Sequence, residues 1–295
     1  MGGRPFDAMH IFTMGSLVLP LIIGTLARMR GAVLLYEGCE LPFAHQRQTR
    51  WNQLYAREYI RWVYKRYDGI FVISEYLARW FSHRVRPTPH LIRVPILVDL
   101  DQFSLHSPTA GGTNGHGYIA YTGSLDPCKG VDDLLRAFAL MAPAHPDVQL
   151  WILGNTNEPD AGRLVELSRA LEIASRVRLL GLVPRTDLPR LLGQAKALVI
   201  PHRSGDRTQA AFPTKLGEYL ATGRPVIATQ VGELDDYLTD SVDVYLVPPD
   251  DPQALAVRLR EVLDRPEDAG VVGRRGRQTA RERFEYRAQG ERLVK

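Results

Sequence analysis

The chain has 295 residues, 45% of them hydrophobic and 24% charged, which describes a globular protein with room for two α/β domains and excludes a disordered one. The two cysteines, Cys39 and Cys128, form no cluster and the eight histidines show no ligand spacing, so the sequence argues against a disulfide framework and a zinc site. Such cysteine usage fits a reducing, cytoplasmic compartment. Residues 1–106 carry 13 basic and 8 acidic residues, and the remainder 24 and 25, which favours an anionic partner for the first part and disfavours nucleic-acid binding throughout.

The first part of the chain predicts a parallel α/β unit. We expect strands over 9–12, 32–36, 69–74 and 91–95, and helices over 17–30, 46–67 and from Glu75 onward. The apolar run from Leu17 to Leu26 is too short to span a bilayer and is expected to form a buried helix. A glycine-rich stretch, 110–117, is the clearest domain boundary.

The predicted helix over 46–67 carries basic residues on one side and aromatic residues beside them. The basic side includes Arg50, Arg57 and Arg61, and the aromatic side Trp51, Tyr55, Tyr59 and Trp62. Basic residues next to interfacial aromatics suit an anionic membrane surface. The alternative is a packed helix whose aromatics belong to the core and whose arginines are solvated.

From Tyr118 onward, strands alternate regularly with helices. We expect strands over 118–122, 148–153, 177–180, 197–201, 225–228 and 244–247, and helices from about 131, over 160–172 and from 186. This alternation predicts a doubly wound parallel sheet that binds ligands at the carboxyl ends of its strands.

Two segments of this second half suit an anion. Pro213 begins a predicted helix with Lys215 in its first turn and Glu218 near its start, so a cation lies at a helix start and a carboxylate could accept ligand hydroxyls. The alternative is an ordinary α/β unit with surface charges. The segment Gly123 to Gly130 follows the first strand of this half and contains Lys129. It does not match the Walker A motif, and no Gly-x-Gly-x-x-Gly motif follows a strand in this sequence. A glycine turn with a lysine could nevertheless bind a diphosphate.

Taken together, these segments resemble the family 4 retaining glycosyltransferases of the GT-B fold (group 1 glycosyltransferases). The matching segments are Tyr121–Ser124 with Lys129-Gly130, Trp151–Gly154, Leu179–Val183, Ala197–Pro201, Phe212–Lys215 through Val226–Ala228, Asp68–Glu75, and Val94-Pro95 with Val98-Asp99 and Phe103. The resemblance implies an α/β fold of two Rossmann-like doubly wound domains facing a cleft. It assigns 1–106 to an acceptor-side domain, 107–280 to the donor domain and 281–295 to a final helix returning to the first domain. Because nothing before Met9 supplies the family's first strand and glycine-rich loop, the first domain is expected to be incomplete by two or three strands, through a fragment boundary or a misplaced start.

The resemblance also implies a donor site. Lys129 would contact the donor diphosphate beside Gly123 and Ser124, Glu218 would bind the ribose hydroxyls, and Leu182 and Val183 would lie near the base. The amides of Phe212, Pro213, Thr214 and Lys215 would lie over the phosphates and the transferred sugar. No metal and no cofactor is expected, because fixed cations and helix starts would neutralise the leaving group.

The sequence departs from the family pattern at three positions. Ser124 stands where the family usually has arginine, and Ala210 stands at the first glutamate of a spaced pair, with Asp206 in the same loop as a substitute. Cys39 stands at the catalytic-side histidine, and Glu37 and Glu40 beside it complete the candidate catalytic group.

The predicted function is a metal-independent, retaining hexosyltransferase that moves a sugar from a nucleotide-diphosphate donor to a glycan or lipid-linked acceptor. A role in cell-envelope polysaccharide synthesis, in the cytoplasm at the inner face of the membrane, is expected. Two alternatives stay open: a non-catalytic nucleotide-sugar-binding protein, and a GT-B epimerase acting on nucleotide sugars.

Overall fold

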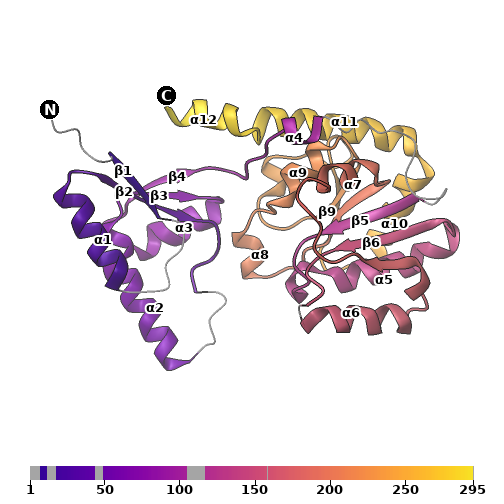
Figure 1. The fold of residues 1–295 in the computed structure, drawn as a ribbon, viewed down its shortest axis with the longest axis horizontal. Helices are drawn as coiled ribbons and strands as arrows, with labels where there is room; N and C mark the ends of the chain where they lie inside the picture. Colours follow the sequence, from indigo (N-terminus) through magenta and orange to yellow (C-terminus); the bar gives the residue numbers. More distant parts are fainter. Residues whose placement is uncertain (1–6, 12–17, 44–48, 105–116, 158, 295) are drawn as a thin grey trace. The chain divides into compact units, whose positions relative to one another are not determined.

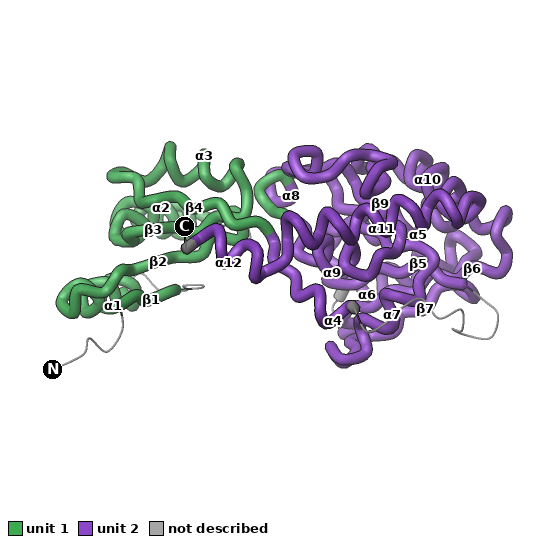
Figure 2. The backbone as a smooth tube through the Cα atoms, turned by 90° about the horizontal axis from the view of Figure 1, so that it is seen from above, with its two compact units in different colours: residues 1–95, 209–212 green, residues 96–208, 213–295 purple. Residues whose placement is uncertain are grey.

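The computed structural model describes residues 7–11, 18–43, 49–104, 117–157 and 159–294. The chain forms two compact units, residues 1–95 with 209–212, and residues 96–208 with 213–295 (Figure 2). The units divide after Pro95, whereas the expected boundary between 106 and 107, with most of the glycine-rich stretch, lies outside the described residues.

The first unit contains a parallel sheet in which the strands follow their chain order. The strands are β1 (Ala8–Ile11), β2 (Val33–Gly38), β3 (Gly69–Val72) and β4 (His90–Arg93). They are connected by the helices α1 (Val18–Met29), α2 (Arg50–Trp62) and α3 (Glu75–Arg84). Right-handed crossovers between strands in sequential order place successive helices on the same face of a sheet.

An aromatic cluster forms the core of this unit. Its members are Tyr36, Tyr59, Tyr64, Tyr67 and Phe81. The ring of Tyr64 lies 5.3 Å from that of Tyr36 on β2 and 5.1 Å from those of Tyr59 and Phe81, on α2 and α3. Aromatic pairs at such separations add to the free energy of area burial, so this cluster holds both helices to the sheet.

The helix predicted over 46–67 is shorter in the structure. Residues 44–48 lie outside the described part, α2 begins at Arg50 after the cap Thr49, and it ends at Trp62. A short 3-10 helix, η1 (Tyr64–Arg66), follows. The expectation of one continuous helix was wrong because Tyr64 and Tyr67 turn inward to the aromatic cluster, which the helical period does not allow.

The second unit contains a six-stranded parallel sheet. Its strands are β5 (Gly117–Thr122), β6 (Val148–Leu153), β7 (Val177–Leu179), β8 (Ala197–Ile200), β9 (Val226–Thr229) and β10 (Tyr245–Val247). Their order is β10-β9-β8-β5-β6-β7, so the order in which strands are added to the sheet reverses between β5 and β8, which are parallel neighbours. Ligands of open α/β sheets bind at such a switch point, outside the carboxyl ends of the strands.

Helices cover both faces of this sheet (Figure 1). One face carries α5 (Val131–Met141), α6 (Pro159–Ala170) and α10 (Pro252–Asp264), and the other α7 (Leu188–Gln194), α9 (Lys215–Ala221) and α11 (Pro266–Arg283). The short α4 (Asp101–Ser104) contacts α7 and α9, and α8 (Asp206–Ala210) runs into the segment that packs with the first unit. The predicted doubly wound α/β arrangement is confirmed for this unit.

The C-terminal segment differs from the single helix expected over 281–295. Arg281 still belongs to α11, and a separate helix, α12 (Tyr286–Val294), follows. Between them Val98 forms a parallel bridge with Glu285, and its backbone N–H donates to the Phe284 carbonyl at 2.8 Å. The Tyr286 N–H in turn donates to the Val98 carbonyl. Because Val98 occupies the Phe284 carbonyl and the Tyr286 N–H, these two groups are not available for the hydrogen bonds of one continuous helix.

Candidate functional site

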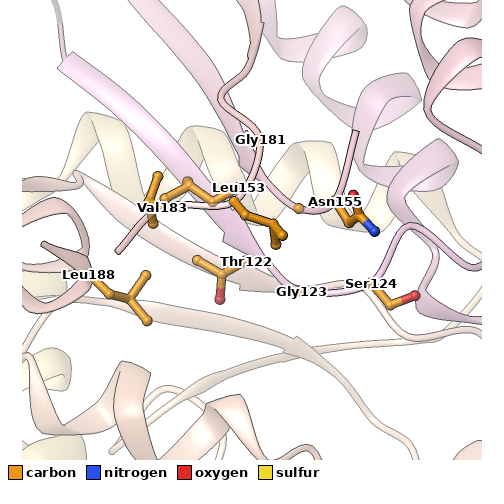
Figure 3. Close-up of a pocket in the computed structure, with 10 residues that line it drawn as sticks. Thr122, Gly123, Ser124, Leu153, Asn155, Gly181, Val183 and Leu188 are labelled. Carbon is orange, nitrogen blue, oxygen red and sulfur yellow. The ribbon is translucent and has the colours of Figure 1, made fainter. Parts of the chain in front are cut away.

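A pocket of about 350 Å³ opens at the carboxyl ends of β5, β6 and β7 in the second unit. It is lined by Thr122, Gly123, Ser124, Leu153, Gly154, Asn155, Gly181, Leu182, Val183 and Leu188. Figure 3 shows Val183 and Leu188 at one end and the polar Asn155 and Ser124 at the other. The volume and the mixed lining are those of a small-molecule site, with an apolar end for a planar ring and a polar end for an anion.

Glycines shape the polar end of this pocket. Gly123 has a φ of +128° and its N–H donates to the Leu153 carbonyl at 2.9 Å, which ties the end of β5 to β6. A Cβ on Gly154 would lie 2.6 Å from the Gly123 carbonyl oxygen. Only glycine permits this close approach of two loop backbones, and it leaves their peptide groups accessible to a ligand.

The side chain of Lys215 reaches the end of β5. It turns inward, donating from its ammonium to the Thr122 carbonyl, and a Cβ on Gly123 would lie 2.5 Å from Lys215 Nζ. Burial, together with the positive charge of Lys129, lowers the pKa of Lys215 to about 7. The charges of Lys129 and Lys215 therefore repel each other, and a bound anion would relieve that repulsion.

His202 was not predicted from the sequence, yet it lies two residues beyond β8 at the switch point. It is 3% exposed, and its Nε2 has no hydrogen-bond partner among the described residues. Burial, with the charges of Lys215 and Lys129, holds the pKa of His202 well below its usual value, so the imidazole is neutral. A histidine directly after the predicted buried strand 197–201 was the signal that could have found it.

The loop that carries Lys129 is clamped to the chain segment after β8. The 3-10 helix η2 (Pro127–Lys129) ends at Gly130, whose φ is +68° and whose Cβ, if present, would lie 1.7 Å from the Pro201 carbonyl oxygen. Arg203 donates two hydrogen bonds, of 2.8 and 3.0 Å, to the carboxylate of Asp133 on α5. A bidentate pair of this kind fixes geometry as well as charge, so Lys129 stands on a braced turn.

Glu218 lies in the first turn of α9, as predicted, and its side chain is 18% exposed. Its Oε1 accepts a 2.7 Å hydrogen bond from Arg185, a residue of the loop between β7 and α7. The same loop supplies the predicted base contacts Leu182 and Val183, and both line the pocket. No local pattern in the sequence pointed to Arg185, because only the fold brings this loop to α9.

The predicted segment 212–215 is divided between the two units: Phe212 belongs to the first, and Pro213, Thr214 and Lys215 belong to the second. The helix α9 begins at Lys215, two residues later than expected, because Pro213 accepts a turn hydrogen bond from the Leu216 N–H at 2.9 Å. Thr214 is exposed at the cap position, and its side chain forms no capping bond within the described residues. Phe212 is buried and belongs to the segment 209–212 of the first unit, where the Ala210 carbonyl accepts a bond from Ser74. A donor contact by Phe212 stays a prediction.

The candidate catalytic residues lie at the end of β2 in the first unit. The Cys39 thiol donates to Glu37 Oε1 at 3.0 Å, and Glu37 Oε2 lies 3.2 Å from Nε2 of His10 on β1, a residue that no sequence pattern singled out. Burial, and then the Glu37 carboxylate, raise the pKa of Cys39 to about 12, and the charge of the exposed Glu40 adds to this effect. The thiol is therefore protonated at neutral pH, and the catalytic role of this group stays a prediction.

The basic side chains of α2 are exposed, whereas its aromatic side chains are partly buried and partly exposed. Arg50, Arg57 and Arg61 all face outward, and Trp51 is 80% exposed. Tyr59 is buried in the aromatic cluster, whereas Trp62 is 43% exposed and stacks beneath Lys65 at 4.2 Å. Tyr59 therefore belongs to the core, as the alternative interpretation expected, whereas the membrane-binding role of the exposed arginines and tryptophans stays a prediction.

Membrane-spanning helices and metal clusters are both absent from the described ranges. No helix there is long and apolar enough to cross a membrane, and no group of three or more His, Cys, Asp or Glu side chains in those ranges could hold a metal ion.

Comparisons with known proteins identify the family of the chain. A model of the family described as Glycosyl transferases group 1 matches residues 110–279. The chain is 27% identical over 289 residues to the GDP-mannose-dependent monoacylated alpha-(1-6)-phosphatidylinositol monomannoside mannosyltransferase of Corynebacterium glutamicum, covering 94% of this chain and 72% of that protein. It is 26% identical to the GDP-mannose-dependent alpha-(1-6)-phosphatidylinositol monomannoside mannosyltransferase of Mycolicibacterium smegmatis, covering 92% and 72%.

Solved structures show the same fold. Sucrose-phosphate synthase from Thermosynechococcus elongatus superposes with a TM-score of 0.78 at 21% identity, covering 98% of this chain and 72% of that one. The Anabaena protein HepE in complex with UDP gives a TM-score of 0.75 at 15% identity, covering 99% and 78%. At these identities the likeness speaks for the fold alone, and it confirms the predicted GT-B class.

Proposed function

Because the chain belongs to the group 1 glycosyl transferases, we propose that it transfers a sugar from a nucleotide-diphosphate donor bound in the pocket at the carboxyl ends of β5, β6 and β7. The observation that carries this proposal is the Lys215 ammonium, which is held at the glycine turn at the end of β5 and is repelled by the charge of Lys129. Two cations that repel each other favour binding of a dianionic group such as a diphosphate.

The pocket suggests how a donor would lie. The apolar end formed by Val183 and Leu188 suits the base, and Glu218 on α9 suits the ribose hydroxyls. The diphosphate would then reach the glycine turn at Gly123 and the two lysines. Their fixed charges would stabilise the negative charge that develops on the departing phosphate, and electrostatic stabilisation of this kind is usually an enzyme's main contribution to rate.

Retention and independence from metal ions are further parts of the proposal. Lys129 and Lys215 would supply the positive charge that leaving-group departure requires. The departing phosphate oxygen would accept the proton of the acceptor hydroxyl, so the acceptor attacks from the face that the leaving group vacates. This route yields retention and needs no ionised protein base, which fits the protonated Cys39 thiol.

The relatives suggest which substrates to try first. Both of these proteins, which match over more than nine tenths of the chain, are named as GDP-mannose-dependent mannosyltransferases acting on a phosphatidylinositol mannoside. We therefore propose a GDP-sugar as the donor and a glycan or lipid-linked acceptor. The exposed arginines and tryptophans of α2 would hold the protein at the anionic inner face of the membrane where such an acceptor lies.

A transfer assay tests the proposal. The chain is incubated with radiolabelled GDP-mannose or UDP-glucose and a phosphatidylinositol mannoside, with and without EDTA, and the anomeric configuration of the product is read by NMR. We expect labelled lipid with the donor's configuration and no effect of EDTA. Donor isomerisation without acceptor would instead identify an epimerase, and tight donor binding without turnover would identify a binding protein.

A further inference from the structure

The ion pair between Arg185 and Glu218 joins two elements of the candidate donor site. Arg185 belongs to the loop after β7 whose residues Leu182 and Val183 line the pocket, and Glu218 belongs to α9. The guanidinium nitrogen lies 2.7 Å from Glu218 Oε1, while the Arg185 side chain is 67% exposed and that of Glu218 18%. The carboxylate is thus held within the protein and the cation stands at its solvent side.

This arrangement leaves Glu218 engaged before any nucleotide arrives. A carboxylate that binds a ribose must accept hydrogen bonds from two neighbouring hydroxyls, and Oε1 of Glu218 already accepts one from Arg185. An ion pair with so exposed a cation shifts an equilibrium by no more than about fivefold, so a better set of bonds displaces it readily. A nucleoside whose ribose binds Glu218 would therefore compete with Arg185 for this carboxylate.

The displaced guanidinium would remain close to the nucleotide. The first phosphate is attached to the ribose through its 5′ carbon, so a ribose held by Glu218 brings that phosphate within reach of a long arginine side chain anchored beside it. Arginine binds phosphate oxygens in a bidentate manner and is the preferred cation for this purpose. The glycine turn itself offers the small hydroxyl of Ser124 at the pocket's polar end.

We propose that Arg185 exchanges the Glu218 carboxylate for a donor phosphate when a nucleotide binds, and so discriminates nucleoside phosphates from nucleosides. A nucleoside without phosphates breaks the Arg185–Glu218 ion pair and offers Arg185 no new anionic partner, whereas a nucleoside diphosphate provides one. This exchange rests on the proposed donor site, and it assigns to the β7–α7 loop a specificity role in that site.

The test compares ligands with and without phosphates. Affinities of uridine, UDP, guanosine and GDP are measured by ligand-observed NMR and calorimetry for the full chain and for Arg185→Ala, Arg185→Lys and Arg178→Ala. Arg178 is an exposed arginine on β7, close in sequence but outside the loop that carries Arg185, and serves as the matched control. Because the Arg185 side chain is largely exposed, the melting temperature of each variant should stay that of the parent.

The exchange predicts opposite effects in one variant. Arg185→Ala should tighten nucleoside binding by about two- to fivefold, the release of a surface ion pair, and weaken diphosphate binding by about tenfold, the loss of a charged hydrogen bond. Arg185→Lys should keep most of the diphosphate affinity, and Arg178→Ala should change neither. If Arg185→Ala weakens the binding of nucleoside and diphosphate equally, Arg185 only holds the loop in place. If this variant changes neither affinity, Arg185 takes no part in nucleotide binding. Both outcomes overturn the exchange while leaving the donor site intact. A parent chain that binds none of the four ligands would overturn the donor site and the exchange together.

Discussion

The ammonium nitrogen of Lys215 lies 4.0 Å from the centre of the Tyr121 ring and donates to the carbonyl of Thr122, so this cation is held by a π-face and a dipole rather than by an acid. Burial and then Lys129 lower its pKa to about 7, while Glu218 and Cys128 act weakly in the opposite direction. A bound diphosphate would raise the pKa of Lys215 again, because an anion beside the ammonium group favours its charged form.

Donor binding should therefore take up a proton at Lys215. Below about pH 7 the lysine is already charged, so affinity for a nucleotide sugar should be constant there. Above that pH, affinity should fall by up to about tenfold per pH unit, until the pH reaches the raised pKa of the complex. Calorimetry between about pH 6 and 8.5 measures this, with a nucleotide sugar as the ligand because its diphosphate carries no proton that titrates in that range.

The matched control is Lys215→Arg. A guanidinium stays charged over the whole range, so the pH dependence should disappear even if the affinity itself changes. A pH profile that is the same in the parent and in this variant would show that Lys215 does not supply the titrating charge.

The contact between Gly130 and Pro201 bears on stability. A Cβ at Gly130 would lie 1.7 Å from the Pro201 carbonyl oxygen, at a φ of +68°. Gly130→Ala should lower the free energy of unfolding by at least roughly 1–3 kcal/mol, the cost of a strained left-handed residue, and should weaken donor binding because Lys129 is displaced. Gly162 on α6 is the control: a Cβ there would meet nothing within 4 Å, so Gly162→Ala should stabilise the helix by about 0.5–1 kcal/mol. Urea unfolding that is equal for Gly130→Ala and the parent would refute the clamp.

Glu218 should matter for the nucleoside part of the donor. Glu218→Ala should weaken binding of a nucleotide sugar by about 1–3 kcal/mol, the cost of losing a charged hydrogen bond. If Arg185 and Glu218 act on the same ligand, the double variant Arg185→Ala, Glu218→Ala should not show the sum of the two single effects. If Glu218→Ala binds a nucleotide sugar with the affinity of the parent, the assignment of the ribose site is wrong.

The sequence predicted the fold well because strand and helix periods repeat regularly from Tyr118 onward. The glycine turn, Lys129, Leu182, Val183 and Glu218 were selected by spacing and resemblance, and the structure brings the pocket residues among them to one sheet edge. Arg185 was missed because its importance comes from its contact with Glu218, which no local pattern encodes, whereas His202 directly follows a predicted strand and that signal was not used. The break at Glu285 and the early end of α2 escaped for the same reason as Arg185: Val98 and the aromatic cluster override the helical period.

The surface of α2 predicts membrane binding. Reversing the charges of Arg50, Arg57 and Arg61 to glutamate should abolish cosedimentation with vesicles containing phosphatidylglycerol, because each basic residue near an anionic surface contributes about 1 kcal/mol. The control reverses three exposed arginines of the second unit, Arg178, Arg260 and Arg275, for the same change in net charge. If both triple variants lose binding equally, only net charge matters and α2 is no docking surface. If the parent chain ignores such vesicles, the membrane proposal is wrong.

Every step of the proposed transfer depends on a nucleotide-diphosphate sugar binding in the pocket at the carboxyl ends of β5, β6 and β7. Calorimetric titration of GDP-mannose and UDP-glucose into the parent chain and into Ser124→Trp tests this binding most directly, because Ser124 is exposed at the pocket's polar end and a tryptophan there would fill the space without disturbing the core. We expect saturable binding of at least one donor by the parent and its loss in the variant, with the melting temperature unchanged. Equal affinity in the two proteins, or no binding of either donor by the parent, would contradict the proposed site.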